Sequence, residues 1–217
     1  MIYIDKIKYG SLPLKSKELA LKDDDLSKKL VQLGLYDKLL DMPPPSNTSS
    51  TTKKELSRLP KLTKNISEPM MEFCIKADKD LVKVFVDYLQ RNNISDITKQ
   101  RLDDTLDLVE PLHYRIKEYY NRPRPHQLAI YYGLELNILI ESKTIHTPAY
   151  PSGHSLESYL LAELLSQKYP KHKSKLMQIA NLTGMSRLLI GVHYKSDHDF
   201  GVYIAKLLID NDLVDIK

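Results

Sequence analysis

The sequence contains little cysteine, little glycine and no long apolar run, and each shortage excludes a class of protein. A single cysteine, Cys74, cannot form a disulfide within the chain, so nothing in the sequence requires an oxidising compartment. Only 7 glycines among 217 residues argue against a turn-rich all-β design. No stretch approaches the roughly 20 apolar residues that a membrane helix needs. The nearest candidate, residues 129–140, is short and contains Glu135 and Asn137. The sequence therefore predicts no membrane span.

A strong excess of one charge is also missing. The 32 Lys and Arg residues against 28 Asp and Glu give a net charge of +4, and the two signs are interleaved along the chain. Nucleic-acid binding is not expected, because no basic stripe interleaved with aromatic residues is present. The first residues, MIYIDKIKYGSL, carry Asp5, Lys6 and Lys8 and have no apolar run of signal-peptide length. We therefore expect a soluble, cytoplasmic protein.

The length and composition fit one globular domain over residues 1–217, since 42% of the residues are hydrophobic. The only low-complexity stretch, residues 43–54, reads PPPSNTSSTTKK and is expected to be an extended loop. Residues 18–35 have helical spacing with a strongly charged face. Residues 1–42 bury too little apolar surface to fold alone, so we expect an N-terminal helical arm that packs on the main body.

After the loop, the spacing of apolar residues is helical almost throughout. Ser67 is a good helix start, and apolar residues follow it at helical intervals as far as Leu89, with Asp78 in that row expected near the rim. Ser95 is expected to cap a second helix, which Pro111 must kink or split. Three further helices are expected over residues 154–168, over 172–190 and from Ser196 onward. β-Branched alternation is nearly absent, so the predicted fold is all-α.

Three short blocks gather cations, histidines and a helix start. They are KEYYNRPRP at residues 117–125, PSGH at residues 151–154, and SRLLIGVHYKSD at residues 186–197. In the second block, Pro and Gly open a helix whose free backbone N–H groups and dipole suit an anion such as phosphate. His154 would stand at the mouth of that anion site.

The other two blocks supply cations and a histidine. Lys117 ends a helix and Arg124 lies between two prolines, so both charges are held at a fixed separation. Arg187 projects from an apolar helical row, where a buried guanidinium needs an anionic partner. Gly191 breaks that helix and leaves His193 in a turn, where Asp197 in the next helix can accept a hydrogen bond from one ring nitrogen. That bond would fix the tautomer and leave the other nitrogen free to attack. The remaining histidines are expected to be ordinary surface residues, namely His113, His126, His146, His172 and His198.

Together, these blocks resemble the signature of the type 2 phosphatidic acid phosphatase superfamily, which also contains the vanadium haloperoxidases. Its pattern has three parts. The first is Lys, six residues of any type, then Arg-Pro; the second is Pro-Ser-Gly-His; the third is Ser-Arg, five residues of any type, His, three residues of any type, then Asp. All three parts are present over residues 117–197. Within this superfamily, the chain looks most like the class A bacterial nonspecific acid phosphatases. The segments that carry this resemblance are KEYYNRPRP, YPSGHS, SRLLIGVHYKSD and the upstream PPP. The similarity extends from about residue 40 to the C-terminus.

The resemblance implies a compact helical bundle of the acid phosphatase and vanadium haloperoxidase type, and a metal-independent phosphatase with a phosphohistidine intermediate. His193 would be the nucleophile, Asp197 its orienting carboxylate and His154 the general acid. The implied phosphate-binding residues are Lys117, Arg124, Ser152, Gly153 and Arg187. No cofactor or metal is implied, although vanadate would bind the phosphate pocket, and activity is expected to be highest on the acidic side.

Some features depart from the family pattern. Secreted members carry a signal peptide and soluble relatives often carry disulfides, neither of which this sequence offers. Arg122 adds a cation beside the signature arginine, and His126 stands where an aromatic residue is common. Both are expected to alter the pocket wall and hence the substrate.

Two other functions are compatible with the same residues. A vanadium haloperoxidase shares the pocket but tends to be a longer chain, and a non-catalytic anion-binding module would keep the pocket without turnover. Small phosphomonoesters, including nucleotides, are the leading substrate class, with pyrophosphates and soluble lipid phosphates left open. A homodimer would be unsurprising, because the amphipathic N-terminal arm has no obvious partner in the sequence.

Overall fold

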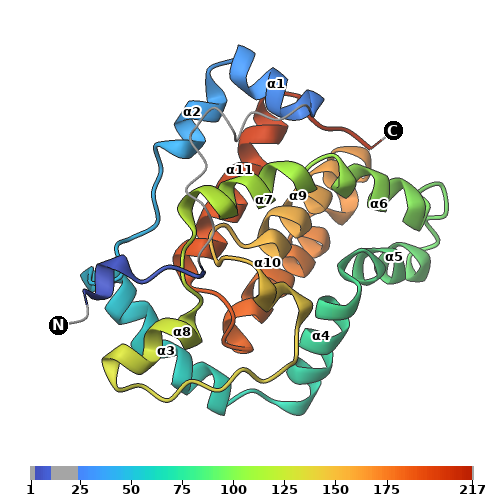
Figure 1. Ribbon diagram of the computed structural model, residues 1–217. Helices are drawn as coiled ribbons and strands as arrows, with labels where there is room; N and C mark the ends of the chain where they lie inside the picture. Colours follow the sequence, from blue (N-terminus) through green and yellow to red (C-terminus); the bar gives the residue numbers. More distant parts are fainter. Residues whose placement is uncertain (1–2, 11–23, 217) are drawn as a thin grey trace.

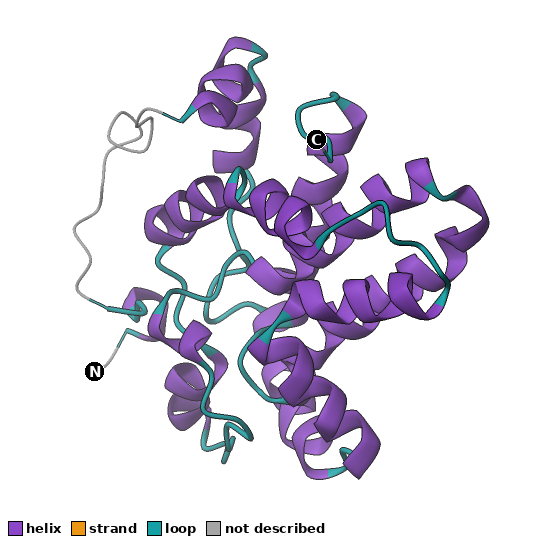
Figure 2. Cartoon of the chain, turned by 90° about the vertical axis from the view of Figure 1, so that its right-hand side faces the viewer, coloured by secondary structure: helices purple, strands orange, loops and turns teal. Residues whose placement is uncertain are grey.

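The computed structural model describes residues 3–10 and 24–216, and every regular element in these ranges is helical (Figures 1 and 2), so the predicted all-α fold is confirmed. The α-helices are α1 (Asp25–Gln32), α2 (Leu35–Leu40), α3 (Ser50–Lys64), α4 (Glu68–Lys79), α5 (Leu81–Arg91), α6 (Lys99–Asp107), α7 (Glu110–Tyr120), α8 (Pro125–Ala129), α9 (Gly153–Lys168), α10 (Lys173–Leu189) and α11 (Lys195–Asp210). Short 3-10 turns are η1 (Ile4–Lys6), η3 (Ile130–Tyr132), η4 (Lys143–His146) and η5 (Pro170–His172).

Helix α9 lies at the centre of the molecule, between α10 and α11 (Figure 1). Leu160 of α9 packs in one apolar cluster with residues of α7 and α11, whereas Leu161 packs in another with residues of α5, α6 and α10. A helix that is apolar on both sides must be buried, because no face is left for solvent. The burial of α9 fixes the position of its N-terminus, where the PSGH block begins.

Two glycines allow the three central helices to approach closely. A Cβ atom on Gly201 of α11 would lie 2.7 Å from the carbonyl oxygen of Ser152, and one on Gly184 of α10 would lie 2.6 Å from the ring of His198. Neither gap can hold a methyl group. The contact at Gly201 brings the PSGH block beside the start of α11, where the Ser152 N–H donates to the Asp197 carbonyl oxygen at 3.0 Å.

Helices α1 and α2, in the described part of the N-terminal arm, pack on the main body. Leu30 of α1 and Leu39 of α2 are fully buried in the same apolar cluster as Ile116 of α7. The helix expected over residues 18–35 is shorter, because α1 ends at Gln32 and Gly34 adopts a left-handed conformation, φ 65°, before α2. Residues 18–23 of that expectation lie outside the described residues.

Four other expected boundaries or caps are wrong, because the helices begin after other residues than those expected. The loop expected over residues 43–54 ends at Ser49, whose side chain accepts the Thr52 N–H and starts α3. Asp80 caps α5 and divides the single helix expected after Ser67. Thr98, not Ser95, caps α6, and α11 begins at Lys195 after Tyr194 rather than with a Ser196 cap. The other predicted helices, from residue 153 to residue 189, are confirmed.

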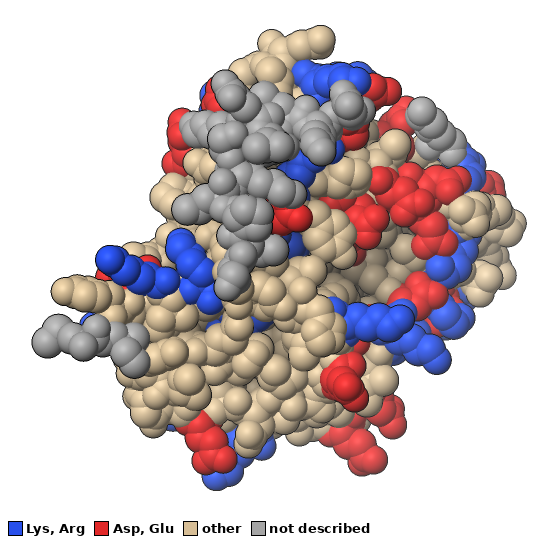
Figure 3. Space-filling view, viewed as in Figure 1, with Lys and Arg blue, Asp and Glu red and all other residues tan. Residues whose placement is uncertain are grey.

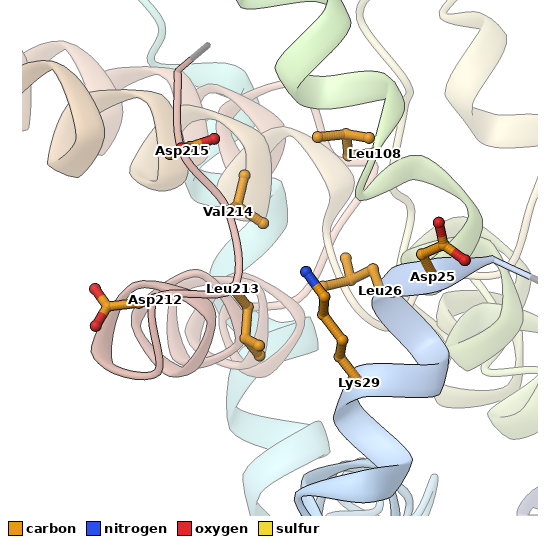
Figure 4. A pocket seen from close by; sticks show the side chains of 8 residues that line it. All are labelled: Asp25, Leu26, Lys29, Leu108, Asp212, Leu213, Val214 and Asp215. Carbon is orange, nitrogen blue, oxygen red and sulfur yellow. The ribbon is translucent and has the colours of Figure 1, made fainter.

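The surface away from the three sequence blocks is mixed in charge. On the face in Figure 3, basic and acidic side chains form small separate groups, and a hollow to the right of centre has both signs around it. A pocket of about 300 Å³ lies between α1 and the C-terminal segment and is lined by Lys29, Asp25 and residues 212–215, among others (Figure 4). None of its lining residues belongs to the three blocks. Over the described ranges, no helix is long and apolar enough to cross a membrane.

Candidate active site

The fold brings the three sequence blocks together at the N-terminus of α9. His193 contacts Arg124 of the first block, and Asp197 contacts Ser152 of the second. Most of the predicted site residues are buried, whereas Gly153 and His154 are partly exposed. The site is therefore nearest to solvent at the end of the PSGH block, at Gly153 and His154.

The His193 and Asp197 pair has the geometry that their four-residue spacing predicts. Gly191 turns the chain out of α10 with φ 80°, and Asp197 lies in the first turn of α11. His193 Nδ1 lies 3.0 Å from Asp197 Oδ2, which also accepts the Tyr194 N–H at 2.9 Å. The carboxylate therefore holds the imidazole and the helix start at the same time.

The other ring nitrogen of His193 is an unprotonated acceptor. Its Nε2 lies 2.8 Å from Nη1 of Arg124, and a guanidinium can only donate. The proton of the neutral ring is therefore on Nδ1, directed at Asp197. Burial, followed by the positive charge of Arg124, lowers the pKa of His193 well below its usual value and keeps this ring neutral. The lone pair of Nε2 is therefore unprotonated and accepts the hydrogen bond from Arg124.

Arg122, expected in the pocket wall, instead contacts the far side of Asp197. Its Nη1 donates to Asp197 Oδ1 at 2.5 Å and to Ser196 Oγ at 2.8 Å, and its guanidinium lies 3.9 Å from the centre of the Tyr194 ring. Glu55 of α3 contacts both Arg122 and Ser196. Its Oε2 lies 3.7 Å from Arg122 Nη2 and accepts a hydrogen bond from the Ser196 hydroxyl. Arg122 is a positioning residue for the His193–Asp197 pair.

Arg187 has a protein anion as its partner. Its Nη1 donates to Asp78 Oδ1 at 2.7 Å, and its Nη2 donates to the hydroxyls of Ser142 and Thr144. Asp78 of α4, which we expected near the rim without a role, therefore neutralises and orients Arg187. The Nε–H of Arg187 is buried and has no hydrogen-bond partner within the described structure, so one donor remains for an anion.

Arg124 and Lys117 are fixed by backbone carbonyls. Arg124 donates to the carbonyl oxygens of Thr144, Thr147 and Val192, and Lys117 Nζ donates to that of Pro148 at 2.7 Å. Burial, followed by the charge of Arg124, lowers the pKa of Lys117 well below its ordinary value. Buried cations held this closely together create a strong local preference for an anion.

The PSGH block starts α9 as predicted. Ser152 is the N-cap, and its hydroxyl accepts the Ser155 N–H at 3.4 Å. His154 follows in the first turn, where burial and then Arg187 lower the pKa of its ring well below the usual value, against a hydrogen bond to the backbone of Ala77. The N–H groups of this turn and the positive end of the helix dipole face the opening of the site.

Two histidines expected at the surface are buried. His198 is 4% exposed and its Nδ1 lies 2.9 Å from Ser155 Oγ, while His113 is 4% exposed and lies beside Glu157. His126, on α8, is half-buried rather than an ordinary surface residue. The contacts of His198 support the α9–α11 packing, which no local sequence pattern indicates. Over the described ranges, no group of three or more His, Cys, Asp or Glu residues is placed to hold a metal ion.

Comparisons with known proteins agree with this arrangement. Residues 107–209 match the model of the PAP2 superfamily. A non-specific acid phosphatase of Salmonella typhi is 35% identical over 89 residues, and one of Providencia stuartii is 33% identical over 89 residues. These alignments cover 41% of this chain and 35% of each relative, so the matched segment spans about a third of the relatives' length.

A solved structure shows the same fold. It is described as the first transmembrane PAP2 type phosphatidylglycerolphosphate phosphatase from Bacillus subtilis, and it superimposes with a TM-score of 0.53 at 20% identity. The superposition covers 86% of this chain and 92% of that chain. The family match over residues 107–209 contains all three blocks that meet at the N-terminus of α9. Over residues 107–209, the chain is similar to the PAP2 superfamily.

Proposed function

We propose that this protein hydrolyses small phosphomonoesters through a phosphohistidine formed on His193, without a metal ion. The observation that carries the proposal is the environment of His193. Its Nδ1 is hydrogen-bonded to a buried carboxylate, and its unprotonated Nε2 lies 2.8 Å from the cationic Arg124. A neutral imidazole so oriented is a nucleophile, and the adjacent cations would hold the phosphoryl group that it attacks.

The phosphate would be bound by charges that are already in place. Lys117, Arg124 and Arg187 supply three buried cations, and the first turn of α9 supplies backbone N–H groups. Phosphoryl transfer requires mainly in-line positioning and compensation of the charge on the equatorial oxygens. Three fixed cations and a helix N-terminus provide this compensation, and this is our reason for proposing a metal-independent reaction.

The reaction would then proceed in two displacements. His193 Nε2 attacks phosphorus, the bond from phosphorus to the ester oxygen breaks, and protonated His154 gives its proton to the leaving alcohol. In the second step, His154 removes a proton from water, which attacks the phosphohistidine and releases inorganic phosphate and neutral His193. Asp197 stabilises the positive charge that the ring carries while phosphorylated.

Release of phosphate from p-nitrophenyl phosphate in the presence of EDTA tests this proposal. We expect EDTA-resistant activity that is lost in His193→Ala and retained in His172→Ala. His172 is a suitable control because it lies beyond the C-terminal end of α9, a helix of 16 residues that is roughly 24 Å long at 1.5 Å per residue. Activity that needs added metal, or that survives in His193→Ala, would contradict the proposal.

A further inference from the structure

Glu157 is a carboxyl group that the proposed reaction does not use. It lies one turn along α9 from Gly153, and its side chain is 20% exposed. Within the described structure no hydrogen bond reaches its oxygens, and His113 Nδ1 lies 3.8 Å from Oε1. Burial, with the charge of Glu110 adding to it, raises the pKa of Glu157 to about 7. A partly buried carboxyl that receives no hydrogen bond from the protein has acceptor oxygens available for a ligand.

His113 is a second unsatisfied group beside it. The residue is 4% exposed, and its Nδ1 is buried without a hydrogen-bond partner among the described residues. It lies one turn before Lys117 on α7. Burial lowers the pKa of His113 to about 3, so the ring is neutral and does not form an ion pair with Glu157.

Both side chains converge on the open end of the phosphate site. A Cβ atom on Gly153 would lie 3.3 Å from Glu157 Oε1 and 3.4 Å from His113 Nε2. Glu157 also follows His154 by three residues, which places the two side chains on neighbouring positions of one helical face. A leaving alcohol that takes its proton from His154 therefore departs past Glu157.

We propose that Glu157, with His113 beside it, forms a leaving-group subsite that selects phosphomonoesters whose alcohol carries an amine or hydroxyl hydrogen-bond donor. The inference rests on the proposed function, because it assigns the direction in which the alcohol leaves. A donor on the alcohol satisfies the carboxyl oxygens of Glu157, and an ammonium group also compensates its charge. An alcohol with only apolar groups leaves the carboxyl unpaired and is disfavoured.

Two esters with leaving groups of similar length test the subsite. O-Phosphoethanolamine carries an ammonium group and ethyl phosphate does not. Near pH 7, where about half of Glu157 is ionised, we expect kcat/KM for O-phosphoethanolamine to be larger, by about tenfold for one charge-assisted hydrogen bond. In Glu157→Gln this ratio should fall to near one, with circular dichroism confirming the fold.

Glu163→Gln is the matched control. Glu163 lies on the same helix, has a similarly exposed side chain, 21% against 20%, and contacts Lys173 outside the site. The control should keep the wild-type ratio. Equal kcat/KM values for the two esters in the wild-type enzyme would overturn the subsite but not the proposed function. This comparison uses the wild-type enzyme only, so it does not depend on whether a variant folds. No hydrolysis of these esters or of p-nitrophenyl phosphate would overturn the proposed function and the subsite together.

Discussion

Arg122 and Asp197 form a buried ion pair in which Nη1 donates to Oδ1 at 2.5 Å, on the opposite side of the carboxylate from His193. The arginine is 2% exposed and the aspartate 0%. Burial raises the pKa of Asp197, and the charge of Arg122 acts most strongly against this rise. The pair therefore favours the ionised form of Asp197, and an ionised Asp197 favours the proton of His193 on Nδ1 rather than on Nε2.

Replacing Arg122 by Gln should lower kcat by about a hundredfold while changing KM little, because an unpaired buried carboxylate loses roughly 3 kcal/mol of stabilisation. Arg122→Lys should recover part of the rate. The matched control is Arg115→Gln on α7, which breaks an ion pair with Asp24 away from the site. Steady-state kinetics on p-nitrophenyl phosphate provide the measurement. A wild-type kcat in a folded Arg122→Gln enzyme would show that Arg122 does not position Asp197 for catalysis.

The local parts of this site could be predicted from sequence, whereas the contacts between distant segments could not. The four-residue interval from His193 to Asp197 fixes their geometry, since it combines one turn with the start of a helix. Arg122 precedes its partner Asp197 by 75 residues, and Asp78 precedes Arg187 by 109. No periodicity links such positions, so their pairing became visible only with the packing of α4, α10 and α11.

The helix ends show the same limit. Ser67 is predicted as a helix start because a polar residue precedes an apolar row, and α4 begins directly after it at Glu68. The Ser and Thr run before α3 offers several equivalent caps, and the structure selects Ser49. Asp80 interrupts an unbroken helical row by capping α5 with its side chain. Propensity does not distinguish among neighbouring polar residues, so tertiary packing decides the boundary.

The pH dependence of catalysis should reflect His154. Because burial and Arg187 lower its pKa below 6.5 in the free protein, kcat/KM should decline as pH rises through that lowered value. The negative charge of a bound phosphate stabilises the imidazolium, so kcat should decline at a higher pH than kcat/KM. Full pH profiles of both constants provide the measurement, and coincident alkaline limbs would argue against His154 as the acid.

A change of leaving group tests the same role independently. Removal of His154 should slow hydrolysis of phenyl phosphate far more than that of p-nitrophenyl phosphate, because p-nitrophenolate leaves without needing a proton. The loss for phenyl phosphate should be within the roughly 10²–10⁴-fold range of a general acid. Comparison of His154→Ala with wild type on both esters gives the answer. Equal losses on the two substrates would indicate that His154 only binds phosphate.

Anion affinity should depend on Asp78, which orients Arg187 through Nη1 at 2.7 Å. In Asp78→Asn, KM and the inhibition constant of vanadate should rise together, by about tenfold for one charge-assisted hydrogen bond. Asp87→Asn is the control, since Asp87 pairs with Lys76 and Lys83 outside the site. An unchanged inhibition constant of vanadate in Asp78→Asn would show that the contact between Asp78 and Arg187 does not contribute to anion binding.

Stability should fall on acidification between pH 6.5 and pH 4.5. The pKa values of buried His113 and His198 are lowered from 6.5 to about 3 and about 4, so the unfolded chain binds their protons first. Glu157 acts oppositely, because its pKa is raised from 4.5 to about 7 and the folded state binds that proton. These two histidine protons outweigh the single proton of Glu157, so the unfolded state binds more protons and stability falls as the pH falls.

Urea unfolding at several pH values measures this slope, and His198→Gln should flatten it by removing one of the two protons. His154 and His193 are also held neutral by burial and act in the same direction as His198. A slope that His198→Gln leaves unchanged would show that His198 is not the group being titrated.

The most direct test of the account is to trap the enzyme during turnover with p-nitrophenyl phosphate and locate the phosphoryl group by mass spectrometry. The account predicts a base-stable, acid-labile phosphoryl group on His193, attached at Nε2, which is absent from His193→Gln and accumulates in His154→Ala if water attack is slowed. A phosphoryl group on another residue, or turnover with no covalent intermediate under conditions that preserve phosphohistidine, would contradict it.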